Sequence, residues 1–165
     1  MTTGRQSDDR LVEAFASASR ALVAVAARSV AGLPGVEVTL PQYRALVILA
    51  TQGPQRIIDL AERLDVNAST ASRMVDRLER KKLVRRRRDE ADRRAMTLDL
   101  TDEGNRLIRQ ATRKRRLEIE RILCDVQPVH REALVEAMVA FAAAAGEPAT
   151  LVHELETLGL EEDNR

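Results

Sequence analysis

The sequence is poor in aromatic residues, in cysteine and in long apolar segments, and each shortage excludes a class of protein. Aromatic residues make up only 2% of the chain, which argues against a platform on which single-stranded bases stack. The single cysteine, Cys124, cannot form a disulfide within the chain. Apolar runs such as Ala137–Ala145 are much shorter than the roughly 20 residues that cross a bilayer, and Met1–Arg10 is polar. We therefore expect a cytoplasmic protein with no membrane partner.

The rest of the composition is that of a globular protein, but its charge is unevenly distributed. Of the 165 residues, 44% are hydrophobic and 32% are charged, which favours one domain around a single core. The segment Arg80–Arg94 holds nine basic and three acidic residues, hence +6, whereas the whole chain carries +1. Such a concentration of positive charge is typical of a surface that docks on a polyanion. The alternative is a solvated basic face that serves only solubility.

Helical patterns dominate the first third of the chain. An apolar seam with spacings of three and four residues predicts a first helix that packs against another helix and ends near Gly32–Gly35. The seam consists of Leu11, Phe15, Ala18, Leu22, Val25 and Ser29. Thr39 and Gln42 form a capping box for a second helix, which stops at a Gly-Pro pair. A third helix is expected over about Gln55–Leu64.

The next segment predicts a helix-turn-helix. Residues 65–67 form a short turn, and Asn67 is a good N-cap for a fourth helix. The expected buried residues of this helix are Ala71, Met74 or Val75, and Leu78.

From Leu83 onward the apolar period changes to that of a strand. Met96, Leu98 and Leu100 alternate with polar or small residues, which predicts a half-buried strand paired with 83–88. The connecting residues 89–94 lack a tight-turn motif, so we expect an open loop. Thr101 then caps a long helix to about residue 124, and a last helix runs from 128 to about 145. The predicted fold class is mainly α with a small β-hairpin wing.

These segments resemble the MarR family of bacterial winged helix-turn-helix regulators. The resemblance is carried by TLPQYRALVILA at 39–50, by DLAERL at 59–64 and by the run from Ser69 through Arg80. Its most specific part is RDEADRRAMTLDLTDEG at 88–104, in which an acidic residue precedes Asp-Arg-Arg and a strand ends in Leu-Thr-x-x-Gly.

The resemblance implies a winged helix-turn-helix domain plus a helical dimerisation domain. We assign 7–32 to an N-terminal dimerisation helix, 39–101 to the DNA-binding domain, 102–146 to C-terminal dimerisation helices and 147–165 to a short extension. The implied molecule is a homodimer on double-stranded DNA, with half-sites about one helical turn apart in a pseudo-palindromic operator. The alternative for the apolar helix faces is packing within one chain.

The fourth helix is then the element expected in the major groove. Ser69, Thr70 and Ser72 can bond base edges or phosphates, while Arg73 and Arg77 can each take guanine O6 and N7 together. The helix N-terminus at Asn67 points amide donors at a phosphate. For each of these side chains the alternative is plain solvation, and Arg77 has the further alternative of an ion pair with a neighbour of Asp76 or with Asp92.

The wing supplies the other expected contacts. The resemblance implies that an arginine at its tip enters the minor groove, and Arg94 is the first candidate and Arg93 the second. Asp92 is expected to brace these arginines, because a carboxylate beside phosphates is repelled. Of Arg85 to Arg88, about two should touch phosphate, and we place Arg86 and Arg88 among the DNA-binding residues.

Family members commonly release DNA when a small aromatic or phenolic effector binds near the dimer helices. By position Tyr43 is the candidate for such a site, although an ordinary core role is the alternative. No cofactor is expected, and the isolated His130 and His153 predict no metal site. Cys124 is expected to pack as a small hydrophobic residue.

Two other functions remain as alternatives. Cys124 and His130 lack the third partner of a nucleophilic site, and the chain has no glycine-rich phosphate loop, so we expect no enzyme. A winged-helix module that binds proteins without binding DNA is the second alternative, although Arg73 and Arg77 argue against it. The resemblance favours a repressor, because a dimer lying across a promoter blocks polymerase.

Overall fold

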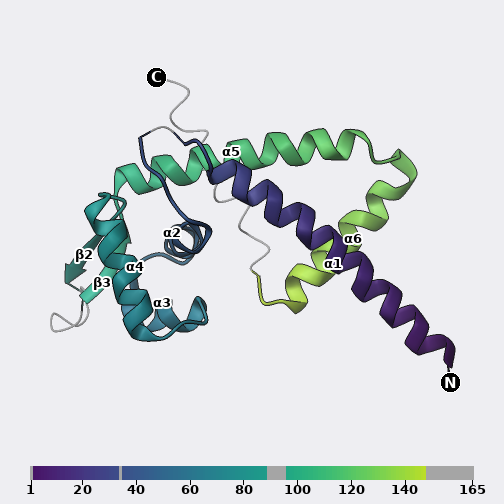
Figure 1. Ribbon diagram of the computed structural model, residues 1–165, viewed down its shortest axis with the longest axis horizontal. Helices are drawn as coiled ribbons and strands as arrows, with labels where there is room; N and C mark the ends of the chain where they lie inside the picture. The colour runs from purple at the N-terminus through teal and green to yellow at the C-terminus, as the bar shows by residue number, and fades with distance from the viewer. Residues whose placement is uncertain (1, 34, 89–95, 148–165) are drawn as a thin grey trace.

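The computed structural model describes residues 2–33, 35–88 and 96–147, which form six helices and three short strands (Figure 1). In chain order these are α1 (Thr2–Val30), α2 (Leu40–Gln52), β1 (Gln55–Arg56), α3 (Ile57–Arg63), α4 (Ala68–Arg80), β2 (Val84–Arg88), β3 (Met96–Leu100), α5 (Asp102–Cys124) and α6 (Pro128–Ala144). The predicted class, mainly α with a small β wing, is confirmed. In Figure 1, α5 extends from the strands and α4 at one end to α6 at the other.

The helix starts follow the predicted capping residues. Thr39 accepts a hydrogen bond from the Gln42 amide, and the Gln42 side chain accepts one from the Thr39 amide, so the capping box is complete. The Asn67 side chain accepts from the Thr70 amide at the start of α4. Thr101 accepts from the Gly104 amide at the start of α5.

The three strands form an antiparallel sheet in the order β1-β3-β2. Its first strand corrects the sequence analysis, because Gln55 and Arg56 were expected to begin a helix and instead pair with β3. The preceding Gly53 has a φ of 72°, which turns the chain sharply enough to bring this segment against the sheet.

The inward residues of β3 also differ from the prediction in part. Leu98 and Leu100 are buried as expected, but Met96 is 48% exposed while Thr97 is buried. Met96 lies at the outer end of the wing opposite Arg88, beyond the reach of the core. Thr97 is flanked on both sides, by Arg56 of β1 and Arg87 of β2.

One hydrophobic core joins the end of α1, the strands and α2 to the first half of α5. Leu46, Leu60, Leu78, Leu83 and Ile108 are its largest fully buried side chains together with two valines. In α4 the buried residues are Ala71, Val75 and Leu78, which settles the open choice in favour of Val75 over Met74.

The other end of the molecule has almost no core in a single chain. We call residues 8–24 of α1 together with α6 the helical arm; none of these residues is buried. Phe15 and Phe141 stack with ring centroids 4.5 Å apart, where α1 and α6 cross in Figure 1. The predicted apolar seam of α1 is therefore fully buried only at Val25 and Ser29, while Leu11 stays 58% exposed.

Candidate nucleic-acid interface

Helix α4 presents an exposed polar face opposite its buried apolar face. Asn67, Ser69, Thr70, Arg73 and Arg77 are exposed and Ser72 is half-buried. Because a residue of an α-helix advances about 100° around the axis, Ser69, Arg73 and Arg77 fall on the centre and one side of this face. Ser72, Asp76 and Glu79 fall on its other edge. The helix thus has a cationic side and an acidic edge.

The leading turn of α4 is held in place by its own side chains. The Ser69 hydroxyl donates to Asn67 Oδ1 at 2.8 Å, and the same oxygen accepts from the Thr70 amide at 2.8 Å. The Arg73 Nε donates to the Ser69 carbonyl at 3.4 Å, within the helix. Asn67 therefore orders the turn that carries the predicted base contacts. Its side-chain oxygen Oδ1 already accepts these two hydrogen bonds.

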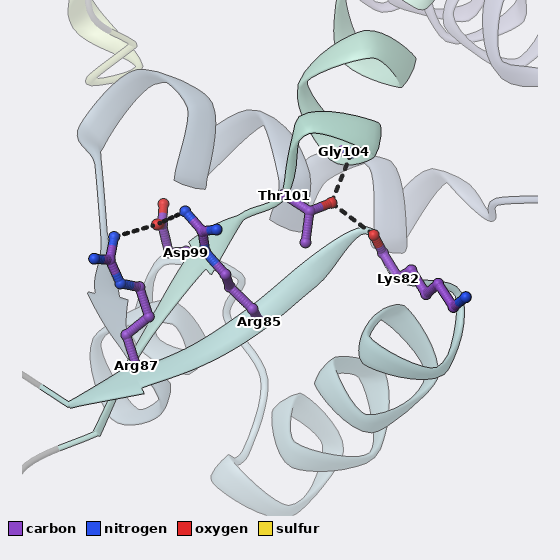
Figure 2. Close-up of polar contacts among 6 residues, drawn as sticks. All are labelled: Lys82, Arg85, Arg87, Asp99, Thr101 and Gly104. Atoms are coloured by element: carbon purple, nitrogen blue, oxygen red, sulfur yellow. Dashed lines mark hydrogen bonds and ion pairs between the residues drawn. The ribbon is translucent and has the colours of Figure 1, made fainter.

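The four consecutive arginines of β2 are divided by the strand between two faces. Arg85 and Arg87 lie on one face and both bond the Asp99 carboxylate of β3, at 3.0 and 3.2 Å (Figure 2). One carboxylate thus partly neutralises two cations that are each about half exposed. Because Arg85 and Arg87 share one carboxylate, the four arginines of β2 do not provide four unpaired positive charges.

Arg86 points to the opposite face, the one from which Val84 enters the core. Its guanidinium reaches α4, where one nitrogen bonds Asp76 and the other bonds Glu79, each at 2.6 Å. The hydrogen bond to Asp76 is the main cause that raises the pKa of Arg86; burial opposes this rise, and the charges of Glu79 and Asp76 add to it. We call these three residues the Arg86 clamp.

The remaining predicted wing residues differ in what the structure says of them. Arg88 is exposed at the outer end of β2 and has no carboxylate partner among the residues that the structure describes. Asp92, Arg93 and Arg94 lie outside the described residues. Their roles at the wing tip stay predictions, as does the DNA contact that we assigned to Arg86.

The base of the wing is joined to α5 by a contact that explains the Leu-Thr-x-x-Gly motif. The Thr101 hydroxyl donates to the Lys82 carbonyl at 2.6 Å and accepts from the Gly104 amide at 3.0 Å (Figure 2). A Cβ at Gly104 would lie 2.2 Å from the Leu83 carbonyl oxygen, so glycine alone fits there without a shift of the backbone. This close approach joins residues about 20 positions apart and could not be predicted from the motif.

The candidate effector residue lies in the core. Tyr43 is 6% exposed and belongs to the main cluster of buried side chains. A hollow of about 430 Å³ opens beside the end of α1, lined by residues of α1 and of the segment that leads to α2, and Tyr43 is not among its lining residues. A part for Tyr43 in effector binding remains a prediction, while its packing role is directly visible.

Other reactive groups are dispersed. Cys124 is an exposed free cysteine at the end of α5, so the expectation that it packs as a core residue is wrong for the single chain. Within the described ranges, no three His, Cys, Asp or Glu side chains gather as metal ligands would. No helix among the described residues is both long and apolar enough to span a lipid bilayer.

Comparison with known proteins gives a match that begins just before α2 and ends at the start of β3. The model described as the MarR family matches residues 38–96. Among curated proteins, the HTH-type transcriptional repressor MdtR of Bacillus subtilis is 41% identical over 68 residues, which are 41% of this chain and 44% of MdtR. The chain spans less than two thirds of the length of the curated relatives that it matches.

Solved structures extend the similarity to most of the chain. The crystal structure of RV1404 from Mycobacterium tuberculosis is 42% identical, with a TM-score of 0.79 over 86% of this chain and 96% of that one. The crystal structure of Streptococcus pneumoniae FabT in complex with DNA has a TM-score of 0.70 over 84% of this chain and 96% of FabT. Its identity is 18%, so that likeness concerns the fold.

Proposed function

The chain belongs to the MarR family of transcriptional regulators and is not an enzyme. We propose that it binds a pseudo-palindromic DNA operator as a homodimer in the cytoplasm. The observation that carries the proposal is the exposed side of α4 with Ser69, Thr70, Arg73 and Arg77. The helix itself packs beside the arginine-rich strand β2. A helix enters the major groove while a strand pair beside it follows the backbone. Both elements contribute side chains to the core, α4 through Val75 and Leu78 and β2 through Val84.

Homodimerisation is supported by the helical arm. Val135 and Val139 are 55% and 59% exposed, one turn apart on α6, and Leu11 and Val12 of α1 are similarly exposed. Contiguous apolar surface of this kind on a folded protein marks an interface. A second copy of the same arm offers equally apolar surface, so two chains can bury what one leaves exposed.

The proposed division of labour among the DNA-binding residues follows from their positions. Arg73 and Arg77 on α4 discriminate bases in the major groove, and Arg88 at the end of β2 contacts a phosphate. Arg94 at the wing tip is proposed for the minor groove, so Arg94→Ala should weaken operator binding strongly and leave the dimer folded. Wild-type affinity of that variant in a binding titration would remove the wing from the mechanism.

The regulatory direction and the effector complete the proposal. We propose repression, supported by the name of the relative MdtR, and release from DNA by a small aromatic effector that binds near α1 and α2. The hollow beside Leu33, Val36 and Val38 offers a place for such a ligand.

The experiment uses fluorescence anisotropy with the full chain and a labelled duplex from the region upstream of its own gene. We expect an affinity for that duplex at least about a hundredfold above the affinity for a shuffled duplex at about 0.15 M salt. Equal affinity for both duplexes would contradict sequence-specific regulation. No binding at low salt, together with capture of another protein, would favour a winged-helix protein-interaction module instead.

A further inference from the structure

The acidic edge of α4 needs an explanation in a helix that approaches DNA. Asp76 and Glu79 are about half and 38% exposed, and they lie one turn apart on the edge that faces the wing. Two carboxylates so close to phosphates are repelled, unless a cation neutralises them. Within the described residues, Arg86 is the cation that bonds both.

The geometry of Arg86 favours these carboxylates over a phosphate. Two nitrogens of its guanidinium each donate to a different carboxylate at 2.6 Å, and hydrogen bonds between charged groups are the strong ones. Its side chain is 35% exposed, compared with 52% and 53% for Arg85 and Arg87 on the outer face of the strand. To bind a phosphate, Arg86 would have to leave two charged hydrogen bonds.

The clamp also connects the two elements that must reach DNA together. Asp76 and Glu79 belong to α4, and Arg86 lies in the middle of β2, three residues beyond the turn at Lys82 and Leu83 that joins them. The distance from the helix to the wing therefore depends on the Asp76–Arg86 and Glu79–Arg86 bonds as well as on the core.

We propose that Arg86 is a positioning residue, an inference that rests on the proposed function. Arg86 holds the wing at a fixed place beside α4 through Asp76 and Glu79, and it does not contact DNA. This assignment replaces the phosphate contact that the sequence favoured for Arg86. The negative charge of Asp76 alone would be expected to oppose DNA binding. Asp76 supports DNA binding although it is an anion at the interface.

The sign of the Asp76→Asn effect separates the two accounts. If the residues acted only through their charge, loss of an anion near DNA would strengthen binding. If the clamp positions the wing, Asp76→Asn weakens binding of the upstream duplex by up to about fivefold, because the Asp76–Arg86 pair is partly exposed to solvent. Arg86→Gln should weaken it at least as much, because that variant loses the bonds to both Asp76 and Glu79, and the double variant should be no worse than Arg86→Gln alone.

The salt dependence supplies a second readout, with Arg88→Gln as the matched control on the same strand face. A lost phosphate contact lowers the slope of log affinity against log salt by about one unit. We expect that loss for Arg88→Gln and an unchanged slope for Arg86→Gln. Stronger binding by Asp76→Asn, or a slope loss for Arg86→Gln equal to that of Arg88→Gln, would overturn the proposal.

A measurement without DNA keeps the clamp testable if the proposed function fails. Hydrogen–deuterium exchange of the β2 and β3 amides in the free protein should be faster in Arg86→Gln and in Asp76→Asn than in the wild type, with Arg88→Gln unchanged. Unchanged exchange in the first two variants would overturn the clamp. Failure of the wild-type chain to bind any duplex would instead refute the proposed function alone.

Discussion

We call α2 through β3 the winged unit. It differs from the helical arm in how many of its apolar side chains are buried and in how its charged side chains are paired. The winged unit encloses Leu46, Leu60, Leu78 and Leu98 and pairs most of its wing-strand arginines with carboxylates. The arm buries none of its described side chains, and large apolar residues face solvent on both of its helices. The difference agrees with the proposed homodimer, in which the winged unit has its own core and the arm buries its apolar side chains against a second chain.

The largest effect on DNA binding is expected when charged residues are placed on the helical arm. Val135→Asp with Val139→Asp places two carboxylates on α6 where apolar surface is expected to meet its copy, so we expect monomers. Loss of the second half-site should then lower operator affinity by about a thousandfold. Sedimentation velocity and anisotropy measure both effects, with Glu136→Gln on the same helix as the control. A doubly charged variant that remains dimeric would place the dimer interface elsewhere.

The largest effect on stability is expected where the start of α5 meets the base of the wing. Gly104→Ala forces a Cβ against the Leu83 carbonyl and should lower the free energy of unfolding by about 2 kcal/mol. Chemical denaturation measures this loss. The matched variant Gln110→Ala, at an exposed position of the same helix, should change it by less than about 0.5 kcal/mol. A neutral Gly104→Ala would mean that α5 can shift away from the turn.

Substitutions on the exposed side of α4 should change the sequence specificity of DNA binding. Arg73→Ala is expected to reduce discrimination at one base pair of each half-site by about 1–3 kcal/mol while random DNA is bound nearly as before. Competition titrations with single-base operator variants measure this. An equal loss on operator and random duplexes would show that Arg73 contacts phosphate and not a base.

The smallest effect is expected at the cap of α4. Asn67→Ala removes the acceptor of the Thr70 amide and of the Ser69 hydroxyl, which should cost about 1 kcal/mol of stability. Asn67→Asp retains the acceptor and serves as the conservative control in thermal denaturation. A loss of 1 kcal/mol in both variants would point to the amide group and not to capping.

Local chemistry explains which parts of the fold were predictable. Thr39, Asn67 and Thr101 marked helix starts correctly, because a capping side chain acts on amides two or three residues away. The buried residues of α4 followed from helical spacing. Gln55 and Arg56 were misassigned because their strand is defined by pairing with residues more than 40 positions later.

The same limit applied at the candidate interface. Exposure of Ser69, Thr70, Arg73 and Arg77 could be predicted from the buried face of α4 alone. The partners of Arg86 could not, because Asp76 and Glu79 meet it only once β2 returns beside the helix. Strand alternation did contain a usable indication, since it placed Arg86 on the face opposite Arg85 and Arg87.

The central claim is that two chains, joined through their helical arms, place two copies of α4 and β2 on one duplex. Sedimentation equilibrium of the full chain with a labelled upstream duplex tests it most directly, because it measures the mass of the complex. We expect two chains per duplex at saturation, with no complex of one chain at intermediate ratios. A stable complex of one chain with one duplex, or free DNA at every ratio, would contradict the account.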